Sequence, residues 1–146
     1  EICACLVGSE MCIRDSHIIR ATLDSLCYQV NDVLDAMSAD SGIRLSTLKV
    51  DGGAAANNYL LQTQADISNA PVERPSSVET TALGAAYLAG LAVGFWSGPE
   101  ELAKKHAIDK MFVPDISEEE RRKRLRGWHK AVRCAYNWAR DDDEDE

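Results

Sequence analysis

The sequence predicts an α/β fold with an incomplete sheet, and two kinds of pattern support this. Apolar residues recur at three- and four-residue steps over long stretches, which is typical of helices that bury one face. Two short runs, 45–50 and 72–74, end at a Gly-Gly pair and at a proline and are interpreted as strands. The expected order is helix, strand, helix, strand and then three helices. Because two strands are too few to complete a sheet, we expect a fragment of a larger fold.

The first helix is expected to begin at His17 and to run for about five turns. Gly42 lies just past its pattern, where a left-handed C-cap is expected. In the strand over 45–50, Leu48 and Val50 share one face. The apolar stripe of the helix consists of Ile19, Leu23, Leu26, Cys27, Val30, Val33, Leu34 and Met37.

Three later helices each follow a Ser-x-x-Glu spacing, the signature of a capping box. The helix expected over 78–93 is apolar or small nearly all round, so we expect it to be buried. The second is a short helix to Lys105, and the third carries basic residues beside its apolar side. The three capping pairs are Ser76 with Glu79, Ser97 with Glu100, and Ser117 with Glu120.

The strand over 45–50 runs directly into Asp51-Gly52-Gly53, and a helix is expected from Asn57 to Ile67. Paired glycines at the carboxyl end of a strand let a ligand approach the main chain. The N-terminus of the next helix presents unpaired N–H groups that suit a phosphate. A Gly-Gly pair is more often only a turn, so by itself it is weak evidence for a nucleotide site.

The composition is that of an ordinary globular protein, with 45% apolar and 27% charged residues among 146. The formal charge of −8 includes six acidic residues at 141–146; without them, 16 basic residues face 18 acidic ones, leaving −2. The sequence shows no dominant basic face, so we do not expect nucleic-acid binding. The sequence contains no apolar run of about eighteen residues, so we do not expect a membrane helix.

The cysteines and histidines predict neither a disulfide framework nor a metal site. Their number and spacing lack the pairs that either would need, so we expect reduced thiols and a cytoplasmic protein. Residues 1–16 have no signal-peptide pattern. The residues concerned are Cys3, Cys5, Cys12, Cys27, Cys134, His17, His106 and His129.

Several runs, taken in order, resemble the C-terminal half of the FGGY family of carbohydrate kinases, and among them the glycerol kinases. His17–Asp24 resembles the second half of that family's signature. The long Thr-Thr-Ala-Leu-Gly-Ala-Ala run, with Asn-Asn and Glu-Arg-Pro, indicates the glycerol kinases in particular. The resemblance covers about 17–138. The other runs are 50–67, 72–75, 79–96 and 127–132.

The resemblance implies part of the C-terminal domain of an actin-like (ribonuclease H-like) kinase, with ATP bound in a cleft between two domains. By this resemblance Gly53 offers its backbone to the phosphate–ribose region, Asn57 helps to hold the adenosine, and Gly52 shapes the turn. The resemblance places Asp51 beside this site, and Asp51 also suits a cap for the turn. Asn57 also suits the N-cap of its helix.

The implied reaction is ATP-dependent phosphorylation of glycerol to sn-glycerol 3-phosphate by a cytoplasmic enzyme, a homo-oligomer at full length. The family's catalytic aspartate, glycerol-binding residues, first phosphate loop and Mg²⁺ ligands precede this chain, so no catalytic or metal residue is expected in it. We therefore expect the chain alone to be inactive. Four aspartates are expected to be solvated surface charges and not bases: Asp24, Asp32, Asp35 and Asp66.

Basic residues from Arg121 to Arg126 are interpreted as a solvated helix face with i to i+4 ion pairs. In some relatives this surface receives an inhibitory component of the sugar phosphotransferase system, and a glutamate matching Glu120 completes a zinc site. The neighbouring residues differ here, so that partner is only a candidate. Trp96, Trp128 and Trp138 are interpreted as packing residues.

Three segments are expected along the chain. Residues 1–16 do not match the family's loop and resemble translated adapter sequence, so we interpret them as a non-native leader. Residues 17–138 are the kinase part, and 139–146 are an acidic disordered tail with no assignable role beyond solubility. Two alternatives stay open: another FGGY sugar kinase, or a non-catalytic α/β interaction module, which the exposed edges of so short a sheet argue against.

Overall fold

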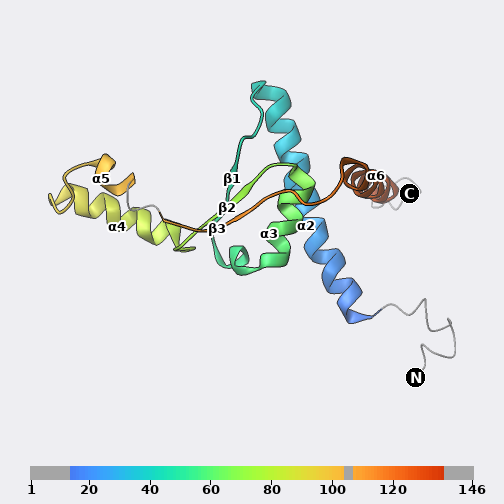
Figure 1. Cartoon of the computed structure of the whole chain (residues 1–146), viewed down its shortest axis with the longest axis horizontal. Helices are drawn as coiled ribbons and strands as arrows, with labels where there is room; N and C mark the ends of the chain where they lie inside the picture. The colour runs from blue at the N-terminus through green and yellow to red at the C-terminus, as the bar shows by residue number, and fades with distance from the viewer. Residues whose placement is uncertain (1–13, 104–106, 137–146) are drawn as a thin grey trace, which may run out of the picture.

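The computed structural model describes residues 14–103 and 107–136 (Figure 1). A small three-stranded sheet lies at its centre; α3 lies against the sheet, α2 packs along α3, and α6 lies beyond them. Helices α4 and α5 extend away on the other side of the sheet (Figure 1). The elements are α2 (Asp15–Ser41), β1 (Leu48–Lys49), the 3₁₀ turn η1 (Gly53–Ala56), α3 (Asn58–Ser68), β2 (Val72–Pro75), α4 (Thr80–Ala92), α5 (Pro99–Ala103), β3 (Ile108–Phe112) and α6 (Glu118–Ala135).

The sheet has the strand order β1-β2-β3, with β1 parallel to β2 and β2 antiparallel to β3. Leu48 pairs with Val72, and Val72 pairs in turn with Phe112. Pro75 is the last residue of β2 and follows an irregularity in the register, the kind of position where a sheet tolerates proline. The α/β prediction is therefore confirmed, with one strand more than the sequence indicated.

The core lies between the sheet and α3. It is formed by small and medium apolar side chains, since Val72 is fully buried and Leu61 and Phe112 are each 3% exposed. Leu48 of β1 and Val50, which directly follows β1, both pack against it, in agreement with the prediction that they share a face. Complete burial of a side chain such as Val72 contributes about 1.5–3 kcal/mol to folding. This core fixes the end of β1, where the glycine pair begins.

Helix α2 confirms the first helical pattern, but it begins at Asp15 instead of His17, and its 27 residues make it longer than the expected length of about five turns. It ends at Gly42, which has φ of 69° and donates its backbone N–H to Ser38 at 3.0 Å, as a left-handed C-cap does. The apolar stripe is only partly covered in the described structure. Cys27 is fully buried, whereas Met37 at the far end is 61% exposed.

Strand β3 was not predicted, because the sequence Ile-Asp-Lys-Met-Phe over 108–112 has no clear alternation of apolar and polar residues. Only Phe112 is buried among its five residues. The strand forms through backbone pairing with β2, which is a long-range contact that local periodicity does not report.

The expectation that the apolar helix over 78–93 is buried is wrong for the described structure. No residue of α4 is buried, and Leu88 is 71% exposed. Its periodicity identifies a helix that needs a partner, but the described residues do not supply one that covers it. The Ser76–Glu79 capping box is also wrong, because Glu79 is the N-cap and its side chain makes no capping hydrogen bond.

The other two capping pairs are correct in part. Ser117 accepts a hydrogen bond from the Glu120 backbone N–H at 3.2 Å, as predicted. The Glu120 carboxylate, however, accepts from Arg124 Nε at 2.9 Å. Ser97 bonds to the Glu101 carboxylate through both its N–H and its hydroxyl, so the partner is one residue later than expected.

Candidate nucleotide-binding turn

The turn after β1 is held in place at its first two residues. Gly52 has φ of 80° and ψ of 174°, a conformation that essentially only glycine adopts. Its N–H donates to the Val78 carbonyl at 2.8 Å. The Thr80 hydroxyl donates to the Asp51 carboxylate. Hydrogen bonds thus hold Asp51 and Gly52 against the first residue of α4 and the segment just before it. The backbone conformation of the turn requires a glycine at Gly52.

Gly53 opens η1 and is exposed. Among the described residues, a Cβ placed on it would meet no atom within 4 Å, so this part of the chain does not require a glycine here. Among the described residues, no acceptor pairs with the backbone N–H of Gly53 or of Ala54. The turn therefore offers two exposed donors at a point where a ligand can approach the main chain.

Asn57 caps α3. Its side-chain oxygen accepts from the Leu60 backbone N–H at 3.1 Å, which confirms the interpretation as an N-cap. The residue is exposed, and nothing in the described part of the chain pairs with its amide nitrogen. The capping bond fixes the oxygen, so the amide nitrogen remains as a donor beside η1.

Gly52, Gly53 and Asn57 thus lie within six residues of one turn, but the turn is not a closed cavity. A pocket of about 260 Å³ lies beside it, lined by Lys49, Val50, Asp51, Glu73, Pro75 and Thr80. A more apolar groove of about 300 Å³ lies between α2, β1 and α3, and the Gln64 side chain lines it. Gln64 Nε2 is buried without a hydrogen-bond partner among the described residues. Of the predicted site residues, Gly53 and Asn57 are exposed and Gly52 is half-buried, and all three lie on this open turn.

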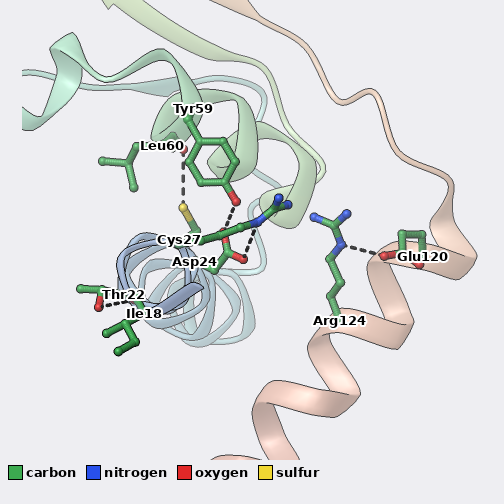
Figure 2. A network of polar contacts seen from close by, with 9 residues as sticks. Ile18, Thr22, Asp24, Cys27, Tyr59, Leu60, Glu120 and Arg124 are labelled. Carbon is green, nitrogen blue, oxygen red and sulfur yellow. Dashed lines mark hydrogen bonds and ion pairs between the residues drawn. The ribbon is translucent and has the colours of Figure 1, made fainter. Parts of the chain in front are cut away.

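The start of α3 is tied to α2 by a polar network (Figure 2). The Tyr59 hydroxyl donates to Asp24 at 2.5 Å, and the Cys27 thiol points to the Leu60 carbonyl at 3.5 Å (Figure 2). Burial, together with the nearby charge of Asp24, raises the pKa of Cys27 from 9.0 to about 12. Burial and the hydrogen bond to Asp24 also raise the pKa of Tyr59. Sequence reasoning missed this network because its partners are 35 residues apart.

The expectation that four aspartates are solvated charges is wrong for Asp66, which is buried; Asp35 is exposed, Asp24 and Asp32 are half-buried, and all four accept hydrogen bonds. Asp66 is 7% exposed and accepts from Gln62 and from the Asp115 backbone N–H at 2.9 Å. Asp32 accepts from Trp128 Nε1 at 2.7 Å and lies 3.2 Å from His129 Nε2. Asp35 accepts from Asn31 at 2.9 Å. Asp32 thus joins α2 to α6, and Asp66 of α3 holds the backbone at Asp115.

Arg74 is the residue near the turn that sequence reasoning left without a role. It donates hydrogen bonds to both η1 and α3 and pairs with Asp109 of β3. The sequence did contain one signal for such a role: an arginine lies within a predicted strand, and the first two residues of that strand are buried in the structure. Sequence alone does not say which groups such an arginine reaches.

Within residues 14–103 and 107–136, no three His, Cys, Asp or Glu side chains come together as a metal site. The Arg124 hydrogen bond lowers the pKa of Glu120, and Lys123 also lies 3.8 Å from that carboxylate. The i to i+4 ion pairs predicted for this helix are present, since Arg122 also pairs with Glu118 at 2.8 Å. None of the described helices combines the length and apolar character needed to span a bilayer.

Three comparisons with known proteins give consistent results. A glycerol kinase of Agathobacter rectalis is 60% identical over 137 residues, which is 94% of this chain and 28% of that protein. The crystal structure of the Plasmodium falciparum glycerol kinase with ADP superposes with a TM-score of 0.77 at 34% identity, over 88% of this chain and 26% of that one. A xylulose kinase of Rhodospirillum rubrum shares the fold, with a TM-score of 0.69 at 18% identity over 90% of this chain and 27% of its own.

The chain spans about a quarter of the length of the relatives that it matches. Its structural neighbours are kinases with the actin-like ATPase fold, as expected. The family match covers residues 3–93 and begins inside the segment 1–16 that was interpreted as a leader. It is to the C-terminal domain of the FGGY family of carbohydrate kinases, and the chain belongs to that family.

Proposed function

We propose that this chain is the nucleotide side of a glycerol kinase, which transfers the γ-phosphoryl group of ATP to glycerol and forms sn-glycerol 3-phosphate. The observation that carries the proposal is the 60% identity to a glycerol kinase over 94% of the chain. The likeness to a xylulose kinase, at 18% identity, extends to the fold alone. Another FGGY sugar kinase is therefore the weaker alternative.

The geometry of the turn fits an ATP molecule. The N–H groups of Gly53 and Ala54 and the amide nitrogen of Asn57 are all exposed donors, without acceptors among the described residues. Phosphate, ribose and adenine are rich in acceptors, so these donors complement them. The open space at Gly53 leaves room for the ligand to contact the main chain. Residues 52–57 would thus form one wall of the site.

The chemical step requires groups that the turn does not supply. ATP brings the phosphoryl group, and transfer depends on positioning and on neutralising charge. Asp51, the carboxylate at the start of the turn, is engaged by Thr80. In this proposal the catalytic aspartate, the glycerol site and the Mg²⁺ ligands belong to other parts of the enzyme. The proposal also includes a cytoplasmic location, a homo-oligomeric enzyme and a regulator that binds near Glu120.

Two proteins test the proposal. The first is the product of the complete gene in which this sequence occurs, assayed for ATP-dependent phosphorylation of glycerol, xylulose and gluconate. The second is a chimera in which residues 17–138 replace the matching segment of the Agathobacter rectalis glycerol kinase. We expect glycerol to be the preferred acceptor of the first, and the chimera to phosphorylate glycerol. A folded chimera without activity would contradict the proposal, and a preference for a sugar would favour the alternative.

Asn57 can be tested in the chimera by two substitutions. Asn57→Ser keeps an oxygen for the Leu60 N–H and removes the amide donor, whereas Asn57→Ala removes both. Loss of the cap costs about 1 kcal/mol of stability. We expect both variants to raise the KM for ATP and to leave the KM for glycerol nearly unchanged, and only Asn57→Ala to lower the melting temperature clearly. If Asn57→Ser keeps the parent's KM for ATP, Asn57 acts only as a cap.

A further inference from the structure

Arg74 lies behind the turn and is held firmly. Its side chain projects from β2 and is 14% exposed. The guanidinium carbon lies 5.5 Å from the centre of the Phe112 ring, which is buried in the core. A planar cation placed over an aromatic ring and shielded from water has few alternative positions. Arg74 can therefore act as a fixed support for the groups that it contacts.

One nitrogen of Arg74 contacts both sides of Asn57. Nη1 donates to the Asn58 side-chain oxygen at 2.8 Å and to the Ala55 carbonyl at 3.1 Å, with the Ala56 carbonyl at 3.5 Å. Ala55 and Ala56 end the 3₁₀ turn η1, where carbonyl groups have no partner within the turn itself. The guanidinium supplies that partner and joins η1 to the first residue of α3.

The opposite edge of the guanidinium is anchored in the sheet. Nε and Nη2 both lie 2.7 Å from the same carboxylate oxygen of Asp109 on β3. The ion pair sets the plane of the guanidinium, and that plane directs Nη1 at the turn. The rigid fork of an arginine can serve both sets of acceptors at once, whereas the single ammonium of a lysine cannot.

We infer that Arg74 is a positioning residue for nucleotide binding, and this inference rests on the proposed function. The donors of Gly53 and Asn57 lie at the two ends of a five-residue segment, and a ligand that binds both needs them at a fixed separation. Arg74 holds the carbonyls between them and thereby fixes that separation. It acts through the segment and does not contact the nucleotide.

The test is Arg74→Lys in the chimera, with ATP and glycerol varied separately. The lysine keeps a positive charge beside Asp109 but releases the turn. We expect the KM for ATP to rise about tenfold, with kcat and the KM for glycerol within about twofold of the parent. We also expect faster hydrogen exchange of the backbone amides over 53–60 in the absence of nucleotide.

Two control variants separate positioning from stability. Asp109→Asn removes the charge of the ion pair but keeps an amide oxygen that can accept from Nε and Nη2, so the guanidinium keeps its plane and its contacts with η1 and Asn58. It should lower the melting temperature without changing the KM for ATP. Arg122→Lys makes the same exchange at an exposed arginine of α6 that pairs only with Glu118 among the described residues. It should change neither quantity.

The outcomes are distinguishable. If Arg74→Lys lowers the melting temperature like Asp109→Asn but leaves both the KM for ATP and the amide exchange unchanged, Arg74 only ties β2 to β3 and the inference is wrong. If the parent chimera fails to bind ADP in a calorimetric titration, the proposed function fails instead. In that case the positioning role for a nucleotide is overturned as well, and the exchange over 53–60 reports only whether Arg74 holds the turn.

Discussion

The two glycines of the turn should respond to alanine in opposite ways, because the structure requires only one of them. Gly52 has φ of 80° and ψ of 174°, whereas Gly53 has no positive φ, and a β-carbon added to it would meet no atom within 4 Å. A structural turn without a ligand would tolerate alanine at Gly53. A nucleotide that packs on the main chain at Gly53 would not.

The magnitudes follow from these conformations. Alanine at Gly52 must adopt a backbone region that costs about 1–3 kcal/mol, so Gly52→Ala should lower the free energy of unfolding by that amount. Alanine at Gly53 restricts the unfolded chain without new contacts, which should raise stability by about 0.4–1 kcal/mol. Its methyl group would occupy the space left for the ligand. We expect at least about a tenfold loss of ATP affinity, equivalent to about 1.4 kcal/mol.

The assay is urea denaturation of the chimera with each substitution, paired with calorimetric titration of ATP. The informative result is a Gly53→Ala variant that is as stable as the parent and binds ATP poorly. Equal ATP affinity in Gly53→Ala and the parent would refute the reasoning, because the ligand would then lie elsewhere. Gly53→Val, with a larger side chain in the same open space, checks that a small methyl group was not simply accommodated.

Two further predictions concern other parts of the chain. Cys27 should resist N-ethylmaleimide at pH 8 until denaturant is added, as read by peptide mass spectrometry. Its pKa is about 12 in the folded protein and 9.0 when unfolded, so between these values the unfolded state binds fewer protons than the folded state. The free energy of unfolding should therefore fall as the pH rises through that range. Gly90→Ala places a methyl group 2.5 Å from the Trp96 ring and should shift tryptophan fluorescence, whereas Gly84→Ala in the same helix meets nothing within 4 Å and should not.

Features encoded locally were predictable from the sequence, and features that depend on distant partners were not. The Gly42 cap and the Asn57 cap each need only a few neighbouring residues, and both are present. Strand β3 depends on pairing with β2, and its sequence has little pattern of its own. The apolar character of α4 indicates that it needs a partner, but not that the described residues leave it exposed.

The same distinction applies to the candidate site. The resemblance indicated Gly53 and Asn57 as candidates, and these two residues lie close together in sequence. The groups that hold the turn come from elsewhere: Arg74 from β2, Thr80 from α4 and Asp24 from α2. Each of these contacts spans at least 16 residues, so it depends on the whole fold. The resemblance supplied the candidate residues of the turn, and only the structure identified the groups that hold the turn in place.

The capping bond also limits what Asn57 can offer to a ligand. An asparagine side chain has both an acceptor and two donors, but here the oxygen is used by the Leu60 N–H. Gly53 and Ala54 likewise present only N–H groups. From Gly53 to Asn57 the groups without a partner among the described residues are therefore donors, whereas the Asp51 carboxylate at the start of the turn is an acceptor. A ligand donor placed against residues 53–57 would stay unpaired, at a cost of about 1–3 kcal/mol if buried. The acceptor-rich phosphate and ribose of a nucleotide avoid that cost, whereas a polyamine or another donor-rich ligand would not.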